Sequence, residues 1–173
     1  MNSSIGFGRR TFLAGAAAAA ALSAAPVALA AGQRSGVVVA VEQPHSLRFA
    51  RSLADAGAHS LVARGDLVRF WRDELAPLLA MRPQRISGLS DWSTYLILSG
   101  CAAEQGLRVR HEARHDIATD GRYVAGMLAA GAGSDWSMRL AQAFLHDRLP
   151  SVHIPQQAPA LAGQTTLISW VLA

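Results

Sequence analysis

Apolar positions along the chain follow two spacings, one typical of strands and one typical of amphipathic helices. Short runs that are continuously apolar or alternate with period two predict strands at 36–42, 59–63, 85–89, 107–114 and 165–172. Apolar residues that recur every three or four positions predict helices at 44–57, 66–82, 90–106 and 134–147, with a further helix at 122–130. This alternation predicts a small three-layer α/β domain, in which helices cover both faces of a mostly parallel sheet of about five strands.

The loops that follow the predicted strands are where such a domain would bind a ligand. In parallel α/β sheets, ligands bind beyond the carboxyl ends of the strands. The polar or aromatic residues there, which are our candidate ligand-binding residues, are His45, Arg64, Asp66, Ser90, Asp91 and Trp92. His115 and Asp116 are placed in the same way after the fourth predicted strand.

The sequence "GLSDWS", at 88–93, raises the question of a catalytic serine. A serine on a sharp turn between a strand and a helix is a nucleophile in hydrolases, where a glycine stands two residues before it and two residues after it. Gly88 is present, but Trp92 stands where the second glycine belongs. Ser90, His115 and Asp116 are therefore only weak catalytic candidates, and capping of the next helix is the favoured interpretation.

The same four letters, "SDWS", return at 134–137, again just after a glycine and before a helical pattern. No apolar strand directly precedes the second copy, so it cannot be a nucleophile turn. One tetrapeptide that opens two helices indicates a shared capping role, with a tryptophan on the first turn of each helix.

His111 and His115 lie four residues apart in "LRVRHEARHD". On a helix they could share a metal ion, but the alternation of this segment predicts a strand, on which they would share one face with their backbones about 13 Å apart. We therefore expect no metal site here. The first predicted strand has no glycine-rich loop after it, so no nucleotide cofactor is expected either, and no cofactor of another kind is indicated.

The third predicted helix carries no charge from Trp92 to Ala103. Such a helix is either enclosed in the core or covered by a partner, and its small residues would allow a second helix to approach closely. We therefore expect it to bind a partner protein or a second copy of the chain. Cys101, the single cysteine, is expected to be a buried, inert thiol on this helix.

The first thirty residues have the three zones of an export signal, namely a charged start, a weakly apolar stretch rich in alanine, and a small-residue end. Arg9 and Arg10, followed by Thr11, Phe12 and Leu13, resemble the twin-arginine signal of bacteria. This resemblance implies contact with the twin-arginine translocase, cleavage after Ala30 and a periplasmic location. Residues 31–173 would then form a single domain without a stable membrane span.

Charge and resemblance limit the function further. The formal net charge of +4 is too small an excess to indicate nucleic-acid binding. The segments "ARGDLVRFWRDELAPLL", "GLSDW" and "ISWVL" resemble those of small exported proteobacterial proteins, which implies an α/β domain but no particular reaction. We favour a non-enzymatic periplasmic accessory or binding protein, for example one that serves an exported redox enzyme. A small serine hydrolase using Ser90, or a protein that binds a small ligand or anion, are the alternatives.

Overall fold

The computed structural model describes residues 36–81, 85–128, 133–149 and 163–173. The export signal, with Arg9, Arg10 and the cleavage point after Ala30, lies outside these ranges. Residues from Ser35 to Ala173 form one compact unit. No helix in the described ranges is both long and apolar enough to cross a membrane.

The unit contains a six-stranded sheet in the order β2-β1-β3-β6-β4-β5. The strands are β1 (Val37–Ala40), β2 (His59–Val62), β3 (Ile86–Ser90), β4 (Val109–Ala118), β5 (Tyr123–Gly126) and β6 (Gln164–Leu172). β1 pairs in parallel with β2 and β3, whereas the pairs β3–β6, β6–β4 and β4–β5 are antiparallel. The α/β class is confirmed, but the prediction of about five strands in a mostly parallel sheet is wrong.

The prediction failed at two strands: β5, which lies at the edge of the sheet, and β6, which comes last in the sequence. β4 is antiparallel to β6, which is antiparallel to β3, so β1 to β4 all point the same way, as helical crossovers between them require. β6 fills the space between β3 and β4 in the opposite direction. β5 replaces the helix expected at 122–130 and follows β4 through a short hairpin turn.

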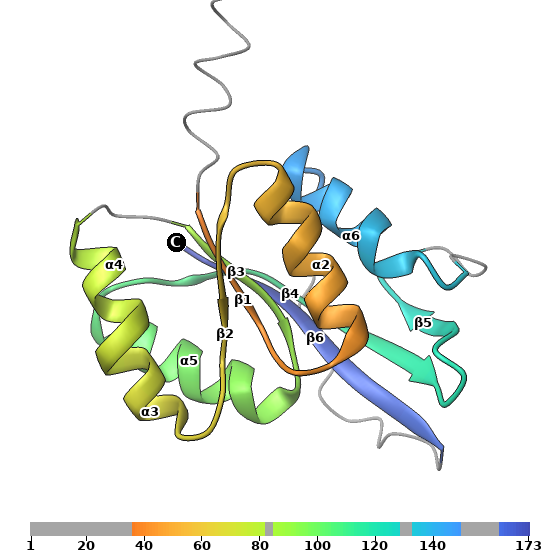
Figure 1. Ribbon diagram of the computed structural model, residues 1–173, viewed down its shortest axis with the longest axis horizontal. Coiled ribbons are helices and arrows are strands. Elements are labelled where there is room, and N and C mark those ends of the chain that lie inside the picture. The colour runs from red at the N-terminus through yellow and green to blue at the C-terminus, as the bar shows by residue number, and fades with distance from the viewer. Residues whose placement is uncertain (1–35, 82–84, 129–132, 150–162) are drawn as a thin grey trace, which may run out of the picture. The chain divides into compact units, whose positions relative to one another are not determined.

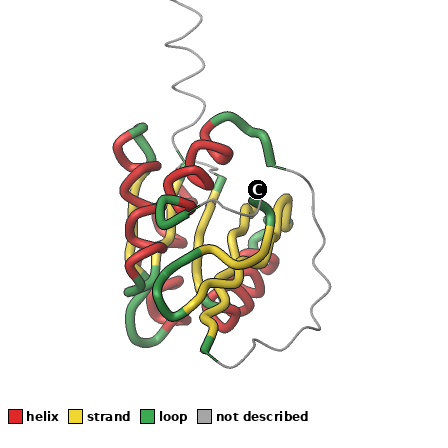
Figure 2. Tube along the Cα trace, turned by 90° about the vertical axis from the view of Figure 1, so that its right-hand side faces the viewer, coloured by secondary structure: helices red, strands yellow, loops and turns green. Residues whose placement is uncertain are grey.

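Helices cover both faces of the sheet (Figure 1). The helical segments are α2 (Pro44–Asp55), α3 (Leu67–Phe70), the π-helical turn η1 (Trp71–Leu75), α4 (Ala76–Met81), α5 (Trp92–Glu104) and α6 (Trp136–Leu145). α2 and α6 pack together on one face, here called the α2/α6 face; the other, covered by α3, η1, α4 and α5, is the α3/α5 face. Figure 2 shows the same elements by type, from a direction at right angles.

Alternate residues of the central strands supply the two cores. On β1, Val38 and Ala40 join the core under α2 and α6, while Val37 and Val39 join the core under α3 and α5. Burial on both faces explains why this strand is a continuous run of β-branched residues and not an alternation of apolar and polar ones.

The helix expected at 66–82 is continuous through Met81 but is not uniform. Its middle turn, η1, is π-helical, and the amide of Ala76 donates to the carbonyl of Trp71, five residues earlier. Pro77 follows directly, and a proline cannot donate to the carbonyl four residues before it and would collide with that carbonyl. The wider turn accommodates Pro77, and the helix continues past it to Met81.

Candidate functional site

Ser90 ends β3 with its side chain on the α3/α5 face and is fully buried. Its hydroxyl donates to the carbonyl of Asp91, at 3.0 Å, and accepts from the indole N–H of Trp170 on β6, also at 3.0 Å. His115 lies on the opposite face of the sheet, in the core under α2 and α6. Among the residues that the structure describes, therefore, no imidazole is hydrogen-bonded to Ser90.

Asp91 is the N-cap of α5, as the capping interpretation predicted. Its carboxylate accepts from the amide of Thr94, at 2.8 Å, and from the hydroxyls of Ser93 and Thr94. Burial alone would raise the pKa of Asp91, but these hydrogen bonds lower it below its usual value. The anionic form that the helix N-terminus favours is therefore the form that is present at neutral pH.

The second copy of "SDWS" is used differently. Asp135 stands at the N-cap of α6 but its side chain makes no capping hydrogen bond, so the shared capping role is wrong for this copy. Both tryptophans do begin a helix: Trp92 is 38 % exposed on α5, whereas Trp136 is completely buried on α6. The same four letters thus give one cap and one buried aromatic anchor.

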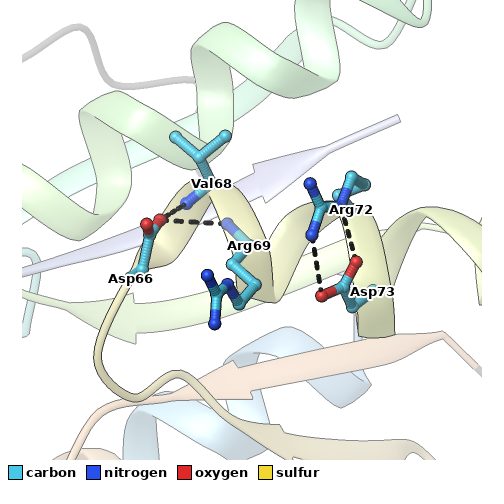
Figure 3. Close-up of polar contacts among 5 residues, drawn as sticks. All are labelled: Asp66, Val68, Arg69, Arg72 and Asp73. Atoms are coloured by element: carbon cyan, nitrogen blue, oxygen red, sulfur yellow. Dashed lines mark hydrogen bonds and ion pairs between the residues drawn. The ribbon is translucent and has the colours of Figure 1, made fainter.

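The carboxyl ends of β1 to β4 lie at one edge of the sheet, and most candidate ligand residues there already have partners. Arg64, after β2, forms an exposed ion pair with Glu42, after β1, at 2.7 Å. Asp66 caps α3 and accepts from the amides of Val68 and Arg69, at 2.9 and 3.0 Å (Figure 3). Those hydrogen bonds, from Arg69 first, lower the pKa of Asp66 below its usual value.

The strand β4 is longer than the sequence predicted. It continues to Ala118, so His115 and Asp116 belong to the strand and not to the loop after it. Pairing with β6 on one side and β5 on the other extends it. Asp116 points to the α3/α5 face, where it accepts from Arg114 at 2.9 Å and from Thr166 at 2.8 Å. A catalytic pair of Ser90 and His115 would need the two residues on one face, and they are on opposite faces.

Two histidines converge on one serine in the middle of the α2/α6 face. The Nε2 atom of His115 lies 2.8 Å from the Oγ of Ser169 on β6, and the Nε2 atom of His111 lies 3.1 Å from the same oxygen. All three residues are at most 3 % exposed. Because a hydroxyl carries one proton, Ser169 donates either to one imidazole or to the carbonyl of Ala113, 3.5 Å away, and it accepts from any imidazole that carries its proton on Nε2.

The other nitrogen of His115, Nδ1, lies 3.2 Å from the hydroxyl of Tyr123 on β5. That hydroxyl accepts from the backbone amide of Leu128, at 3.0 Å. The ring of Trp136 stacks on His115, with centroids 5.3 Å apart, and also contacts Tyr123. His115 is thus hydrogen-bonded at both nitrogens and covered by an indole, so it is held in one orientation.

Burial dominates the titration of His115. Burial first, and then the neighbouring His111, lower the pKa of the imidazole to about 3, although the carboxylate of Asp116 acts in the opposite direction. The ring is therefore neutral at neutral pH, with one nitrogen donating and the other accepting. Serine, histidine and tyrosine in a hydrogen-bonded chain are groups that can relay protons. Because His111, His115 and Ser169 are all buried, these hydrogen-bonded side chains act as a buried polar connection between β4, β5 and β6.

Sequence reasoning identified the shared face of His111 and His115 but missed their partners. Ser169 lies in a run that reads as a buried strand, and Tyr123 lies where a helix was expected. The pairing of β6 with β4, which brings Ser169 opposite Ala113, is a long-range contact without a local sequence signal. The dipeptide Asp120-Gly121, which precedes Tyr123, was a usable signal for the hairpin.

The described residues contain no group of three or more histidine, cysteine, aspartate or glutamate side chains that could hold a metal ion. Cys101 is partly buried on α5, and burial, followed by the nearby carboxylate of Glu104, raises the pKa of its thiol. A thiol whose pKa is raised is a poor nucleophile at neutral pH.

The uncharged helix α5 is covered on one side only. Thr94, Tyr95, Leu98 and Ala102 are buried against the α3/α5 face of the sheet. The opposite side, which we call the α5 face, consists of the exposed residues Trp92, Ser93, Leu96, Ile97, Gly100 and Ala103. Leu96 is 55 % exposed, and Val68 on the adjacent α3 is 60 % exposed. Apolar side chains thus remain in contact with solvent along a helix that has no charged residue before Glu104.

Comparison with known proteins does not identify a family or a relative for this chain. No family model matches the chain, and neither a curated protein nor a solved structure shows significant similarity to it.

Proposed function

We propose that the chain is exported through the twin-arginine route and serves in the periplasm as an accessory protein, which binds a partner protein through the α5 face. The carrying observation is the exposure of Leu96, Ile97 and Trp92 on one uncharged surface. Contiguous apolar surface on a soluble domain is typical of an interaction site, and aromatic residues at its edge are typical anchors. An exported redox enzyme is the expected class of partner, because passengers of the twin-arginine route often hold a cofactor or travel bound to a partner that carries the signal.

The alternative of a serine hydrolase built on Ser90 receives no such support. The hydroxyl of Ser90 is buried between the indole of Trp170 and the start of α5. A substrate would have to displace Trp170, which is itself completely buried, before it could reach the hydroxyl.

The proposal is tested by affinity capture of the exported protein from the periplasm with a matched pair of variants. Leu96→Glu places a charge in the α5 face, while Met138→Glu places one on α6, where Met138 is also exposed, at 41 %. We expect a stoichiometric partner that is retained by the wild type and by Met138→Glu and lost with Leu96→Glu. Equal capture by both variants would contradict the proposal.

Light scattering of the purified protein supplies the second readout. The proposal predicts a monomer at micromolar concentration, because the surface is kept for a different protein. A dimer that Leu96→Glu dissociates would show that the α5 face pairs with a second copy of the chain, and the partner proposal would then be wrong.

A further inference from the structure

Two helix N-termini lie next to each other on the α2/α6 face, at the edge where β1 and β4 end. His45 is in the first turn of α2 and Trp136 begins α6, and their ring centroids lie 5.1 Å apart. Neither N-cap residue, Gln43 or Asp135, makes a side-chain capping hydrogen bond. On the opposite face, α3 and α5 are each capped by an aspartate. The positive ends of two helices therefore meet without a bonded carboxylate between them.

Residues in the first turns of these two helices also carry buried polar atoms without partners. In the described part of the chain, three buried side-chain atoms make no hydrogen bond: Nδ1 of His45, Nε1 of Trp136 and Oγ of Ser137. Trp136 and Ser137 are completely buried. Buried polar groups in native proteins are almost always paired, so three exceptions on two adjacent helix starts call for an explanation. An indole N–H can only donate and a hydroxyl can donate, so a ligand that satisfied them would offer acceptors.

The charged groups around these atoms are of both signs. Burial, followed by the guanidinium of Arg48 on α2, lowers the pKa of His45. His45 is therefore neutral at neutral pH, and one of its nitrogens is a donor. Asp135 is the opposing charge; it is exposed, so water screens it. The next ring beyond Trp136, His115, already has partners at both nitrogens and competes for none of these groups.

We propose that the starts of α2 and α6, with His45, Trp136 and Ser137, bind a small oxyanion of the carboxylate or phosphate class. The indole N–H and the serine hydroxyl donate to its oxygens, and the two helix dipoles stabilise its charge. The site lies on the face of the sheet opposite α5, so it is independent of the proposed docking role. The docking proposal would hold whether or not this site binds an oxyanion.

The test follows the four indole N–H signals of the exported protein by NMR. Sodium acetate and sodium phosphate are titrated separately at constant ionic strength, with sodium chloride replacing them in the control. We expect the Trp136 signal to shift and saturate with at least one of the two oxyanions, and the arm that saturates identifies the class. The signal of Trp170, whose N–H donates to Ser90, is the internal control and stays fixed. Shifts that do not saturate, or that chloride reproduces, would overturn the proposal.

Two variants that keep every ring in place sharpen the test. Ser137→Ala removes one donor and is expected to weaken binding about tenfold, as the loss of a hydrogen bond to a charged group does. Asp135→Asn removes the opposing charge and is expected to strengthen binding about two- to fivefold. Leu96→Glu, on the other face, leaves the affinity unchanged, which separates this site from the docking surface. An affinity that neither Ser137→Ala nor Asp135→Asn alters would contradict the assignment.

Discussion

His115 and Ser169 are 54 positions apart in the chain, yet Nε2 of the first lies 2.8 Å from Oγ of the second. They are not direct partners in the sheet, because Ser169 pairs with Ala113. His111 and His115 therefore reach the serine from either side of Ala113, whose small side chain leaves room for them. The result is a side-chain connection that fixes the register of β4 against β6, in addition to the backbone hydrogen bonds of the two strands.

Removal of the serine hydroxyl tests this connection. Ser169→Ala leaves Nε2 of His115 buried without its partner, and we expect the free energy of unfolding to fall by about 1–3 kcal/mol. Urea denaturation at neutral pH measures the change. Ser60→Ala on the exposed edge strand β2 is the control and is expected to stay within about 0.5 kcal/mol of the wild type. Equal effects of the two variants would show that the connection contributes no stability.

The buried imidazole also predicts acid sensitivity. The pKa of His115 is about 3 in the folded state and near 6.5 in the unfolded state, so the unfolded chain binds the extra proton first. Its contribution to stability is complete above about pH 6.5 and decreases as the pH falls towards 3, by about 2 kcal/mol at pH 5. The measurement is urea denaturation at pH 7.5 and pH 5. His115→Asn, which cannot titrate, is expected to lose less stability between these two values than the wild type. A loss of the same size in the variant would assign the acid sensitivity to other groups.

The two copies of "SDWS" offer a matched pair of cap variants. Asp91→Ala removes three hydrogen bonds at the start of α5, and we expect a loss of about 0.5–2 kcal/mol. Asp135→Ala removes no capping hydrogen bond, so its effect is expected to remain within about 0.5 kcal/mol. Thermal or chemical denaturation of both variants distinguishes the two roles. Losses of equal size would mean that the difference in capping described here does not hold in solution.

Replacement of glycine by alanine is expected to change stability in opposite directions at two positions. A Cβ at Gly88 on β3 would overlap the ring of Trp170, so Gly88→Ala is expected to destabilise the fold by about 1–3 kcal/mol. A Cβ at Gly100 on α5 would meet nothing within 4 Å, so Gly100→Ala is expected to stabilise the helix by about 0.5–1 kcal/mol. Melting temperatures of the two variants should therefore move in opposite directions. A Gly88→Ala variant as stable as the wild type would contradict the packing of Trp170 against β3.

Local pattern was sufficient for the first two thirds of the domain. The alternation of strands and helices from β1 to β4, the cap at Asp91, and the shared face of His111 and His115 all follow from short spacings in the sequence. Each of these features depends on contacts between near neighbours or on the period of one element, which a single sequence contains.

Contacts between distant segments were not predictable in this way. Nothing in the run 164–172 indicates that β6 enters between β3 and β4, and this insertion creates both the Ser90–Trp170 and the His115–Ser169 hydrogen bonds. Buried strands read alike whether they are parallel or antiparallel, because both faces are covered in either case. The fold class was therefore within reach of the sequence, whereas the buried histidine cluster depended on topology.

Site-specific photo-crosslinking in living cells is the sharpest test of the claim that the α5 face binds a partner protein. A photoreactive amino acid replaces Leu96 in one strain and Met138 in another, both exposed apolar positions on opposite faces of the domain. We predict one dominant adduct with a different protein from position 96 and none from position 138. No adduct from position 96, the same adducts from both positions, or an adduct with twice the mass of the chain would contradict the claim.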